Sequence, residues 1–287
     1  MKAKAFSPGH ISGFFEPVYF NNDLSRSGSR GAGVNINLGA TSTVSAINSS
    51  IQNIEVFING KRSPAPVTKL ALKYLIGKNK LNITCKTKLD LPMGQGFGMS
   101  GAGALSSCLA LSKICGMNST DAMSAAHFSE VNLKTGLGDV ISSFMGGFEV
   151  RKTPGLPPWG LIEHIPGKYN VVLSIIGKKI QTKKVLSNKN SLNVISDYGK
   201  YCTKKLIEKP SVENFFYLSN VFSSKTGLAS KKILKIIESS KNIGMMSMCM
   251  LGNSVFAVGK TDDLASLLSK YGKTYVCSVD EYGARII

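Results

Sequence analysis

The sequence predicts an α+β fold in two parts, and three patterns lead to this prediction. Residues 81–91 alternate apolar and polar side chains, which is typical of a strand with one wet face in an antiparallel sheet. Two helical stretches follow, at about 100–115 and 119–133. The segment KTPGLPPWG, residues 152–160, is rich in residues that break helices and strands. It separates the first elements from a second set of strands and helices. The pattern of this second set suggests an α+β sandwich.

The first part is rich in glycine and small residues, and short alternating stretches dominate its beginning. We expect strands and a first helix here, and Asn118 or Ser119 should cap the helix at 119–133 because such side chains accept hydrogen bonds from free backbone amides. The expected strands are Lys2–Ser7, Gly33–Leu38, Thr41–Ile47 and Ile54–Ile58, and the expected helix is Pro66–Ile76.

The second part combines amphipathic helical stretches with short apolar strands. We place the division between the two parts at residues 155 and 156. The expected strands are Asn170–Ile176, Met245–Leu251, Val255–Gly259 and Thr274–Val279, and the expected helices are Ser191–Glu208, Ser211–Ser223, Leu228–Ser239 and Asp262–Lys270.

Composition narrows the class of protein. Of 287 residues, 43% are apolar and 18% are charged, which excludes a largely disordered chain. The longest apolar runs are too short to span a bilayer, and residues 1–10 lack the apolar core of a signal peptide, so we expect a cytoplasmic protein without a membrane partner. The net charge of +18 should attract anions such as nucleic acid or phosphorylated ligands. The charges are spread along the chain, so they only weakly indicate nucleic-acid binding.

A glycine-rich segment, LPMGQGFGMSGAGALSS at residues 91–107, joins the strand at 81–91 to the next helix. Glycines allow a backbone to approach a ligand closely, and the start of a helix offers unpaired amide groups and a positive dipole end. The segment therefore predicts a cradle for phosphate groups.

Two other motifs overlap this segment. Gly96, Gly98 and Gly101 match the dinucleotide fingerprint G-x-G-x-x-G, but that fingerprint follows a buried parallel strand, and the strand at 81–91 is half polar. Residues 98–102, GMSGA, nearly fit the nucleophile elbow G-x-S-x-G of serine hydrolases, and Asp139 and His164 follow in hydrolase order. The central strand that an elbow requires is missing, and no Walker A motif is present.

Five motifs resemble those of a known family. PMGQGFGMS, residues 92–100, is similar to the phosphate loop P-x-G-x-G-L-G-S-S of the GHMP small-molecule kinases, with Phe97 in place of Leu and Met99 in place of the first Ser. PGHISGFFE from residue 8, SGSRGAGVNI from 27, TGLGDV from 135 and CMLGNSVFAVG from 249 together resemble the archaeal pantoate kinase branch of that superfamily. The resemblance runs essentially from end to end, although residues 245–252 keep one glycine where the superfamily motif is glycine-rich.

The resemblance implies a fold and an activity. It implies the GHMP kinase fold, with a ribosomal-protein-S5-domain-2-like domain at 1–155 that binds ATP and substrate, and a ferredoxin-like α/β sandwich at 156–287. It also implies transfer of phosphate from ATP, with Mg²⁺, to the primary hydroxyl of pantoate in coenzyme A biosynthesis. The alternatives are a related kinase of another small alcohol, such as homoserine or mevalonate, or a basic RNA-binding protein. Because members of this branch look like dimers, the resemblance also implies a homodimer.

The resemblance further implies roles for individual residues. Asp139 would be the catalytic base or the electrostatic partner of the attacking hydroxyl, and Ser100 and Glu130 would hold Mg²⁺. Glu130 belongs to a largely apolar helix, where a carboxylate is costly unless it is used. The nucleotide phosphates would contact the loop residues Pro92, Gly94, Gly96, Phe97, Gly98, Met99, Ser100 and Gly101.

Several polar residues are candidates for the substrate. Pantoate carries a carboxylate and two hydroxyl groups, and an Arg side chain can bind a carboxylate through two parallel hydrogen bonds. His127 shares a helix face with Glu130, because the two residues are three positions apart. The candidates are His127, Arg151, Ser27, Ser29, Arg30 and His10, although His10 could also serve only to fix the first loop.

Overall fold

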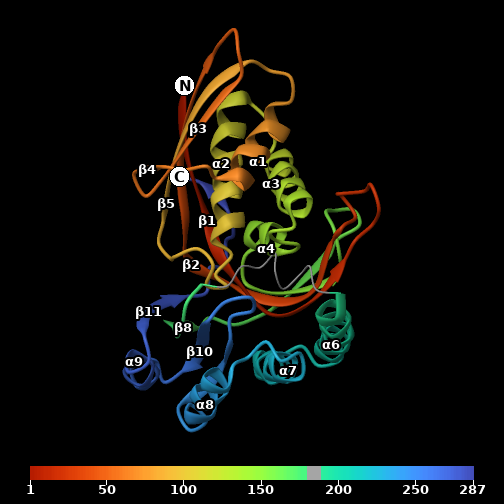
Figure 1. Cartoon of the computed structure of the whole chain (residues 1–287), viewed down its shortest axis with the longest axis vertical. Helices are drawn as coiled ribbons and strands as arrows, with labels where there is room; N and C mark the ends of the chain where they lie inside the picture. Colours follow the sequence, from red (N-terminus) through yellow and green to blue (C-terminus); the bar gives the residue numbers. More distant parts are fainter. Residues whose placement is uncertain (180–188) are drawn as a thin grey trace.

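The computed structural model describes residues 1–179 and 189–287 as two sheets with helices packed on each of them (Figure 1). In the first sheet, β1 (Lys2–Val18) and β2 (Gly28–Asn48) run antiparallel along most of their length. The order of the first sheet is β12-β1-β2-β5-β3-β4, and β6 and β7 extend it from the first half of β2. The remaining strands are β3 (Asn53–Ile58), β4 (Lys61–Arg62), β5 (Leu81–Leu89), β6 (Phe148–Thr153), β7 (Leu161–Ile165) and β12 (Arg285–Ile286).

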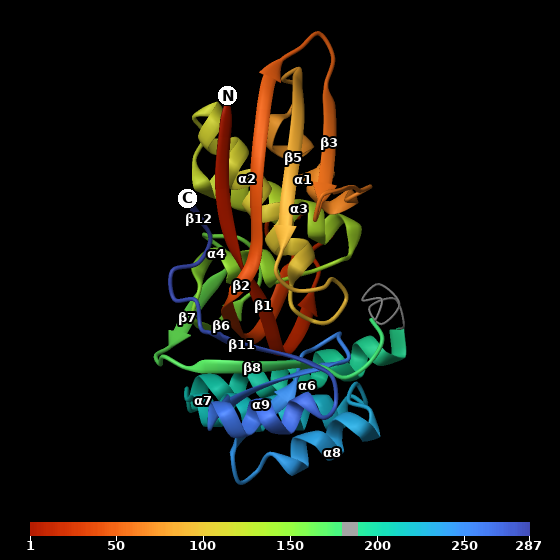
Figure 2. The ribbon, with the colours of Figure 1, turned by 90° about the vertical axis from the view of Figure 1, so that its left-hand side faces the viewer.

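Helices cover one face of this sheet, as Figures 1 and 2 show. α2 (Met99–Cys115) lies against β1 and β2, and α1 (Pro66–Ile76) and α3 (Ser119–Leu133) pack on it. The short helix α4 (Asp139–Met145) follows α3. Asn118 is the N-cap of α3, as predicted, and its amide donates to Asp121 Oδ2 at 3.2 Å. α2 is buried along most of its length because it is surrounded by the sheet and the other two helices.

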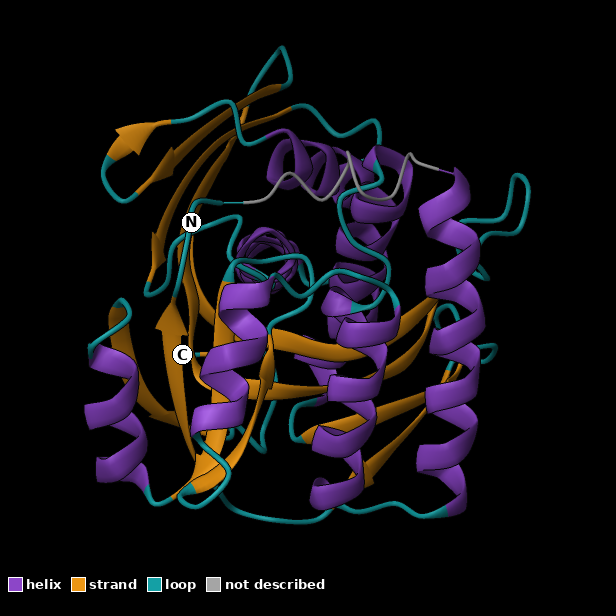
Figure 3. Ribbon diagram, turned by 60° about the horizontal axis from the view of Figure 1, so that its bottom comes forward, coloured by secondary structure: helices purple, strands orange, loops and turns teal. Residues whose placement is uncertain are grey.

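The second sheet has the order β11-β8-β10-β9 and is antiparallel throughout. Its helices lie in a row beneath it, as the view from below shows (Figure 3). The strands are β8 (Asn170–Ile175), β9 (Gly244–Met248), β10 (Ser254–Gly259) and β11 (Lys273–Ser278), and the helices are α6 (Lys189–Glu208), α7 (Val212–Lys225), α8 (Lys231–Ser239) and α9 (Thr261–Ser269).

The two halves are packed directly against each other along β1. A Cβ atom at Gly13 would lie 2.2 Å from Ser219 Oγ of α7, and one at Gly199 of α6 would lie 2.1 Å from Phe15 O. Such distances are impossible for a real side chain, so these two glycines allow the helices to reach the strand. Strands β7 and β12 belong to the first sheet although they follow residue 155, so the first sheet takes strands from both sides of the predicted division.

β-Bulges bend β1 where the PGHISGFFE motif begins. The register with β2 shifts between Pro8 and Gly9 and again between Ser12 and Phe14. A bulge inserts an unpaired residue, which bends the strand and redirects its side chains. Figure 1 shows β1 and β2 curving below the helices at this level. His10 lies between the two shifts, so the bend fixes the direction of its side chain.

The elements predicted from the sequence differ from those of the structure mainly in the length of the first strands. β1 and β2 are far longer than the short stretches predicted, and α4, β7 and β12 were not predicted. β5 pairs antiparallel with β2, as expected, but runs parallel to β3 on its other side. Among the described residues, no helix combines the length and apolar character needed to span a membrane.

Phe215 should contribute strongly to stability, because its ring contacts both halves of the molecule. It lies 6.1 Å from the ring of Phe14, 5.6 Å from Phe148 and 6.0 Å from Phe256, measured between ring centroids. Replacing Phe215 by Ala should lower the free energy of unfolding by about 3–5 kcal/mol. Urea denaturation followed by circular dichroism measures this, with Tyr217→Ala on the exposed side of α7 as the control. Equal effects of the two substitutions would contradict the assignment.

Candidate active site

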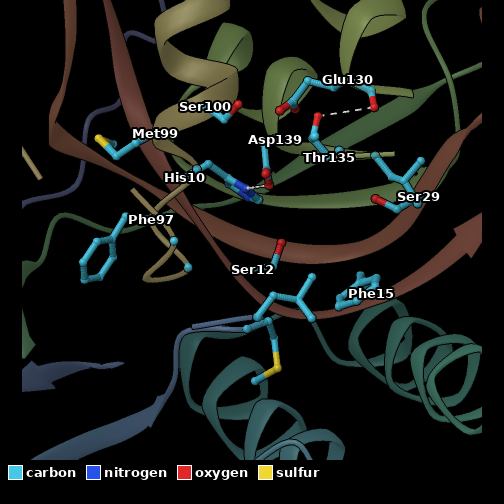
Figure 4. Close-up of a pocket in the computed structure, with 18 of the residues that line it drawn as sticks. His10, Ser12, Phe15, Ser29, Phe97, Met99, Ser100, Glu130, Thr135 and Asp139 are labelled. Carbon is cyan, nitrogen blue, oxygen red and sulfur yellow. Dashed lines mark hydrogen bonds and ion pairs between the residues drawn. The ribbon is translucent and has the colours of Figure 1, made fainter. Parts of the chain in front are cut away.

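An open cavity lies where the glycine-rich loop, β1 and the α3–α4 connection meet (Figure 4). It brings together residues that are far apart in the sequence, and many of them were candidates from the motifs alone. Among those candidates, the ones lining the cavity are His10, Ser29, Gly94, Gly96, Phe97, Gly98, Met99, Ser100, Glu130 and Asp139.

The glycine-rich loop has a backbone conformation that is strongly unfavourable for residues other than glycine. Gly94, Gly96 and Gly98 have φ angles of 79°, 77° and 64°, in the left-handed region. A Cβ atom at Gly98 would lie 2.9 Å from His10 O, so the loop also packs tightly on β1. α2 begins at Met99, and its first amide groups have no partner within the helix. The cavity therefore contains a set of backbone donors suited to phosphate oxygens.

The connection from β9 to β10 contacts both β1 and this loop. Met250 N donates to Ser12 O at 3.2 Å, and the hydroxyl of Ser254 donates to Gln95 O. A Cβ atom at Gly252 would lie 2.1 Å from the Gln95 backbone. Gly252 is the one glycine of residues 245–252, and it lies where this segment contacts the glycine-rich loop. Met250 and Leu251 line the cavity. The C-terminal half thus supplies one wall of the site.

Asp139 is the first residue of α4, and its side chain is 28% exposed in the cavity. Its Oδ1 atom lies 2.8 Å from Nδ1 of His10, and the opposite ring nitrogen of His10, Nε2, lies 2.8 Å from Glu149 Oε1. Burial by itself lowers the pKa of His10, but the hydrogen bonds and charges of the two carboxylates outweigh burial and raise that pKa above its usual value. The candidate base is therefore held next to a buried imidazole that favours the charged form.

Glu130, on α3, is 2% exposed, and its Oε2 atom has no hydrogen-bond partner among the described residues. Burial, together with the negative charge of Asp139, raises the pKa of Glu130 well above its usual value. Gly136 comes so close that a Cβ atom there would lie 2.3 Å from Glu130 Oε2. Ser100 lines the same cavity. A buried carboxylate oxygen without a partner is suited to a cation, since a bound cation would offset its desolvation.

Several candidates for the substrate or the phosphates lie outside the lining of this cavity. The hydroxyl of Ser27 donates to Asp23 O at 2.8 Å and so closes the turn after β1. Arg30 pairs across the strands with Glu16 at 2.7 Å. Of the loop residues, Pro92 is exposed, and Gly101 lies inside α2 against Glu130. Their roles in binding remain predictions.

His127 is 1% exposed and binds the backbone of the turn that precedes β2. Its Nε2 atom lies 2.9 Å from Ser27 O and 3.2 Å from Leu24 O, so it donates its hydrogen to these carbonyls. Burial lowers its pKa to about 4, and the hydrogen bonds to the two carbonyls only partly oppose this. The ring is therefore neutral at pH 7, and its visible contacts hold the turn.

Arg151, on β6, lies behind the cavity wall. Its Nη1 atom donates to Ser142 Oγ at 2.8 Å and also to Glu149 Oε1. Its Nε and Nη2 atoms are buried without partners among the described residues. A Cβ atom at Gly138 would lie 2.7 Å from Arg151 Nε and 2.4 Å from Ser29 Oγ, and both Gly138 and Ser29 line the cavity. The free edge of the guanidinium group thus faces the cavity wall.

Sequence reasoning missed several residues of this site. The cavity is also lined by Thr135, Gly136 and Gly138 of the TGLGDV motif, and by Ser12 and Phe15 of the PGHISGFFE motif. None of these five residues was singled out as a candidate. Their signal was available, because they belong to the same motifs as Asp139 and His10. Glu149 gave no such signal, because a lone Glu in an apolar strand is not recognisable as a partner of His10 until the strands are paired.

Comparisons with known proteins identify the family. The family described as GHMP kinases N terminal domain matches residues 66–147. The pantoate kinase of Methanocaldococcus jannaschii is 36% identical over 96% of this chain and 99% of its own length. The pantoate kinase of Thermococcus kodakarensis is 34% identical over 92% and 89% of the two chains.

The chain belongs to the pantoate kinase family. A solved structure entitled "Phosphotransferase related to CoA biosynthesis pathway" has a TM-score of 0.91 at 30% identity and covers 99% of that chain and 100% of this one. A homoserine kinase from Cytophaga hutchinsonii has a TM-score of 0.69 at 16% identity, which shows a shared fold, covering 97% of that chain and 100% of this one. The predicted family and the predicted GHMP kinase fold are confirmed.

The buried His127 should make the protein sensitive to acid. The pKa of His127 falls from its usual 6.5 when unfolded to about 4 when folded, so its contribution to stability is present above pH 6.5 and is lost as the pH falls toward 4. This loss amounts to about 3 kcal/mol. Between pH 7 and pH 4, the free energy of unfolding should therefore decrease less in a His127→Gln variant than in the unmodified protein.

Urea denaturation at a series of pH values measures this difference. His164→Gln, at an exposed position on β7, serves as the matched control and should behave as the unmodified protein does. The same acid loss in His127→Gln and in the unmodified protein would contradict a neutral, buried His127.

Proposed function

We propose that this protein transfers the γ-phosphoryl group of ATP to the primary hydroxyl of pantoate, giving 4-phosphopantoate and ADP in coenzyme A biosynthesis. The full-length similarity to three pantoate kinases supports the reaction. The observation that carries it within the molecule is the meeting of the glycine-rich loop, Glu130 and Asp139 in one cavity. These are a phosphate cradle, a candidate cation ligand and a candidate base for an attacking hydroxyl.

The loop and the start of α2 would bind the phosphates of ATP. The unpaired amides at the start of α2 create a region of positive potential, and the left-handed glycines keep the backbone free of side chains there. Phosphoryl transfer depends mainly on positioning and on neutralising charge, so a rigid set of backbone donors supports it directly. Phe97 and Met99 are almost completely buried and hold the loop against the core.

Glu130 and Ser100 would hold a magnesium ion, because Mg²⁺ prefers oxygen ligands. When bound, Mg²⁺ would neutralise charge on the phosphate groups. The unpartnered Oε2 atom of Glu130 supports this assignment. Among the described residues, no cluster of three or more His, Cys, Asp or Glu could hold a metal ion.

Asp139 would orient the primary hydroxyl of pantoate and accept its proton. The Oδ1 atom of Asp139 is bonded to His10, which leaves Oδ2 for the hydroxyl. Ser29 lines the cavity nearby, and the free edge of Arg151 lies behind Gly138, where it could receive the pantoate carboxylate. A homodimer and a cytoplasmic location remain predictions from the sequence.

The first experiment measures ADP release by the purified protein with MgATP and a panel of acceptors. Pantoate should stimulate ADP release and should give a far higher kcat/KM than homoserine or mevalonate, because specificity is expressed in that ratio. Release that does not depend on pantoate, or that prefers another alcohol, would overturn the proposed substrate.

Asp139→Asn should abolish most of this activity without unfolding the protein. The amide has the same shape but cannot accept the proton, so kcat should fall roughly 100- to 10,000-fold. Asp197→Asn on the exposed side of α6 provides a control of the same chemistry and should keep its activity. Activity close to normal in Asp139→Asn would show that this carboxylate is not required.

Glu130→Gln should increase the magnesium requirement. Removing the charge of a metal ligand should raise the Mg²⁺ concentration for half-maximal activity by about tenfold or more, since even residues that only support a ligand change metal affinity by 10- to 100-fold. Titrating Mg²⁺ at fixed ATP measures this, and Glu238→Gln on the exposed side of α8 is the control. An unchanged magnesium dependence would rule out Glu130 as a ligand.

A further inference from the structure

A buried chain of charged groups extends from the candidate base into the core. Glu149 on β6 is completely buried, and its Oε1 atom is 2.8 Å from His10 Nε2. Arg151 donates to the same oxygen through Nη1. His10 is also completely buried, and its other nitrogen meets Asp139 at 2.8 Å. The four side chains therefore form a continuous series, Asp139–His10–Glu149–Arg151.

The fold leaves space for this contact at one position of β2. Gly33 is the cross-strand partner of Glu149. A Cβ atom at Gly33 would lie 2.2 Å from His10 Nε2 and 2.9 Å from Glu149 Oε1. Any larger residue at this position would occupy the place of the hydrogen bond. The absence of a side chain at Gly33 is thus a structural requirement of the pair formed by His10 and Glu149.

The arrangement determines how many protons the imidazole ring carries. Both of its nitrogens face carboxylate oxygens, and a neutral ring has only one N–H group, so the ring can donate to both only when doubly protonated. The charged groups facing it are Asp139 from α4, and Glu149 and Arg151 from β6. The glycine-rich loop contacts the backbone of His10 through Phe97 O and Gly98. Glu130 on α3 faces Asp139. Two cations and two anions then balance within the series, as buried charges require.

We propose that Glu149 is a positioning residue for phosphoryl transfer, which keeps His10 doubly protonated and its Nδ1–H directed at Oδ1 of Asp139. Arg151 fixes Glu149 in turn. This inference rests on the proposed function for the role of Asp139, and it adds a residue that touches neither substrate nor nucleotide.

The consequence for the reaction concerns the two oxygens of Asp139. With Oδ1 held by His10, Oδ2 is left to accept the hydrogen bond of the acceptor hydroxyl. During transfer, the hydroxyl proton passes to Oδ2, the hydroxyl oxygen bonds to the γ-phosphorus, and the bond from that phosphorus to the β–γ bridging oxygen breaks to release ADP. The proton on His10 Nδ1 stays in place throughout. A neutral His10 has one N–H group for two carboxylates, so it could donate to Asp139 only in the tautomer that turns the lone pair of Nε2 toward Glu149.

Glu149→Gln tests the proposal, because it keeps the shape of the side chain and removes its charge. Long-range ¹H–¹⁵N NMR of the full-length, substrate-free protein reports the protons on each ring nitrogen, and the three histidines are assigned with His127→Gln and His164→Gln. In the unmodified protein, both nitrogens of His10 should be protonated at pH 7. In Glu149→Gln, the midpoint of His10 deprotonation should move down by about one pH unit or more, which is a tenfold or larger change in the equilibrium.

The pH profile of kcat supplies the second readout. In the unmodified protein, kcat should fall as the pH rises through the deprotonation of His10, and in Glu149→Gln the same fall should occur at lower pH. A side chain with only a structural role would lower kcat equally at all pH values. Glu149→Asp retains the charge and should move the midpoint back toward that of the unmodified protein. Glu163→Gln on the exposed face of β7 should leave both readouts unchanged.

Two results would overturn the proposal: a neutral His10 ring at pH 7 in the unmodified protein, or a His10 midpoint unaffected by Glu149→Gln. The first decides the matter even if Glu149→Gln does not fold. The NMR titration needs no substrate, so it is independent of the proposed reaction, which fails instead if the unmodified protein shows no pantoate-dependent ADP release.

Discussion

The arrangement of the site depends on His10, because this residue of β1 contacts three other elements of the fold. Its amide donates to Phe97 O of the glycine-rich loop at 3.2 Å, and its backbone packs against Gly98. Its ring connects Asp139 at the start of α4 to Glu149 of β6. The β-bulges on either side of His10 direct the residue toward all of these partners. Displacing it would move the phosphate cradle and the candidate base relative to each other, and reaction rates are sensitive to such distances.

The C-terminal half contributes to the same site by supporting it. Met250 binds the backbone of Ser12, and Ser254 binds the loop at Gln95. The aromatic cluster around Phe215 fixes the helices of this half against β1. Neither half could therefore present the cavity in the same form alone. The glycines at the contact points, such as Gly13 and Gly252, allow backbones to approach where side chains would keep them apart.

The sequence was most informative where chemistry and local pattern agree. Helices α1, α2 and α3 were predicted within one or two residues, α1 from its apolar periodicity and α3 together with its N-cap Asn118. The family and its fold followed from the ordered motifs. The lengths of β1 and β2 were not predictable, since their glycine-, serine- and proline-rich stretches have low strand propensity and are held extended by their neighbours. Glu149 escaped notice for a related reason: its importance arises from cross-strand pairing. The roles of individual site residues remain predictions.

The pairing of β1 has a consequence for how the chain reaches this structure during synthesis. One edge of β1 is covered early by β2, but its other edge pairs with β12, at residues 285–286, and α6 and α7 also pack on it. At typical translation rates these partners emerge on the order of ten seconds or more after β1. Until then, a strand edge and the apolar surface around Phe14 stay open to other chains, which is the situation in which aggregation competes with folding. Completion of the first sheet thus depends on residues that are synthesised long after β1.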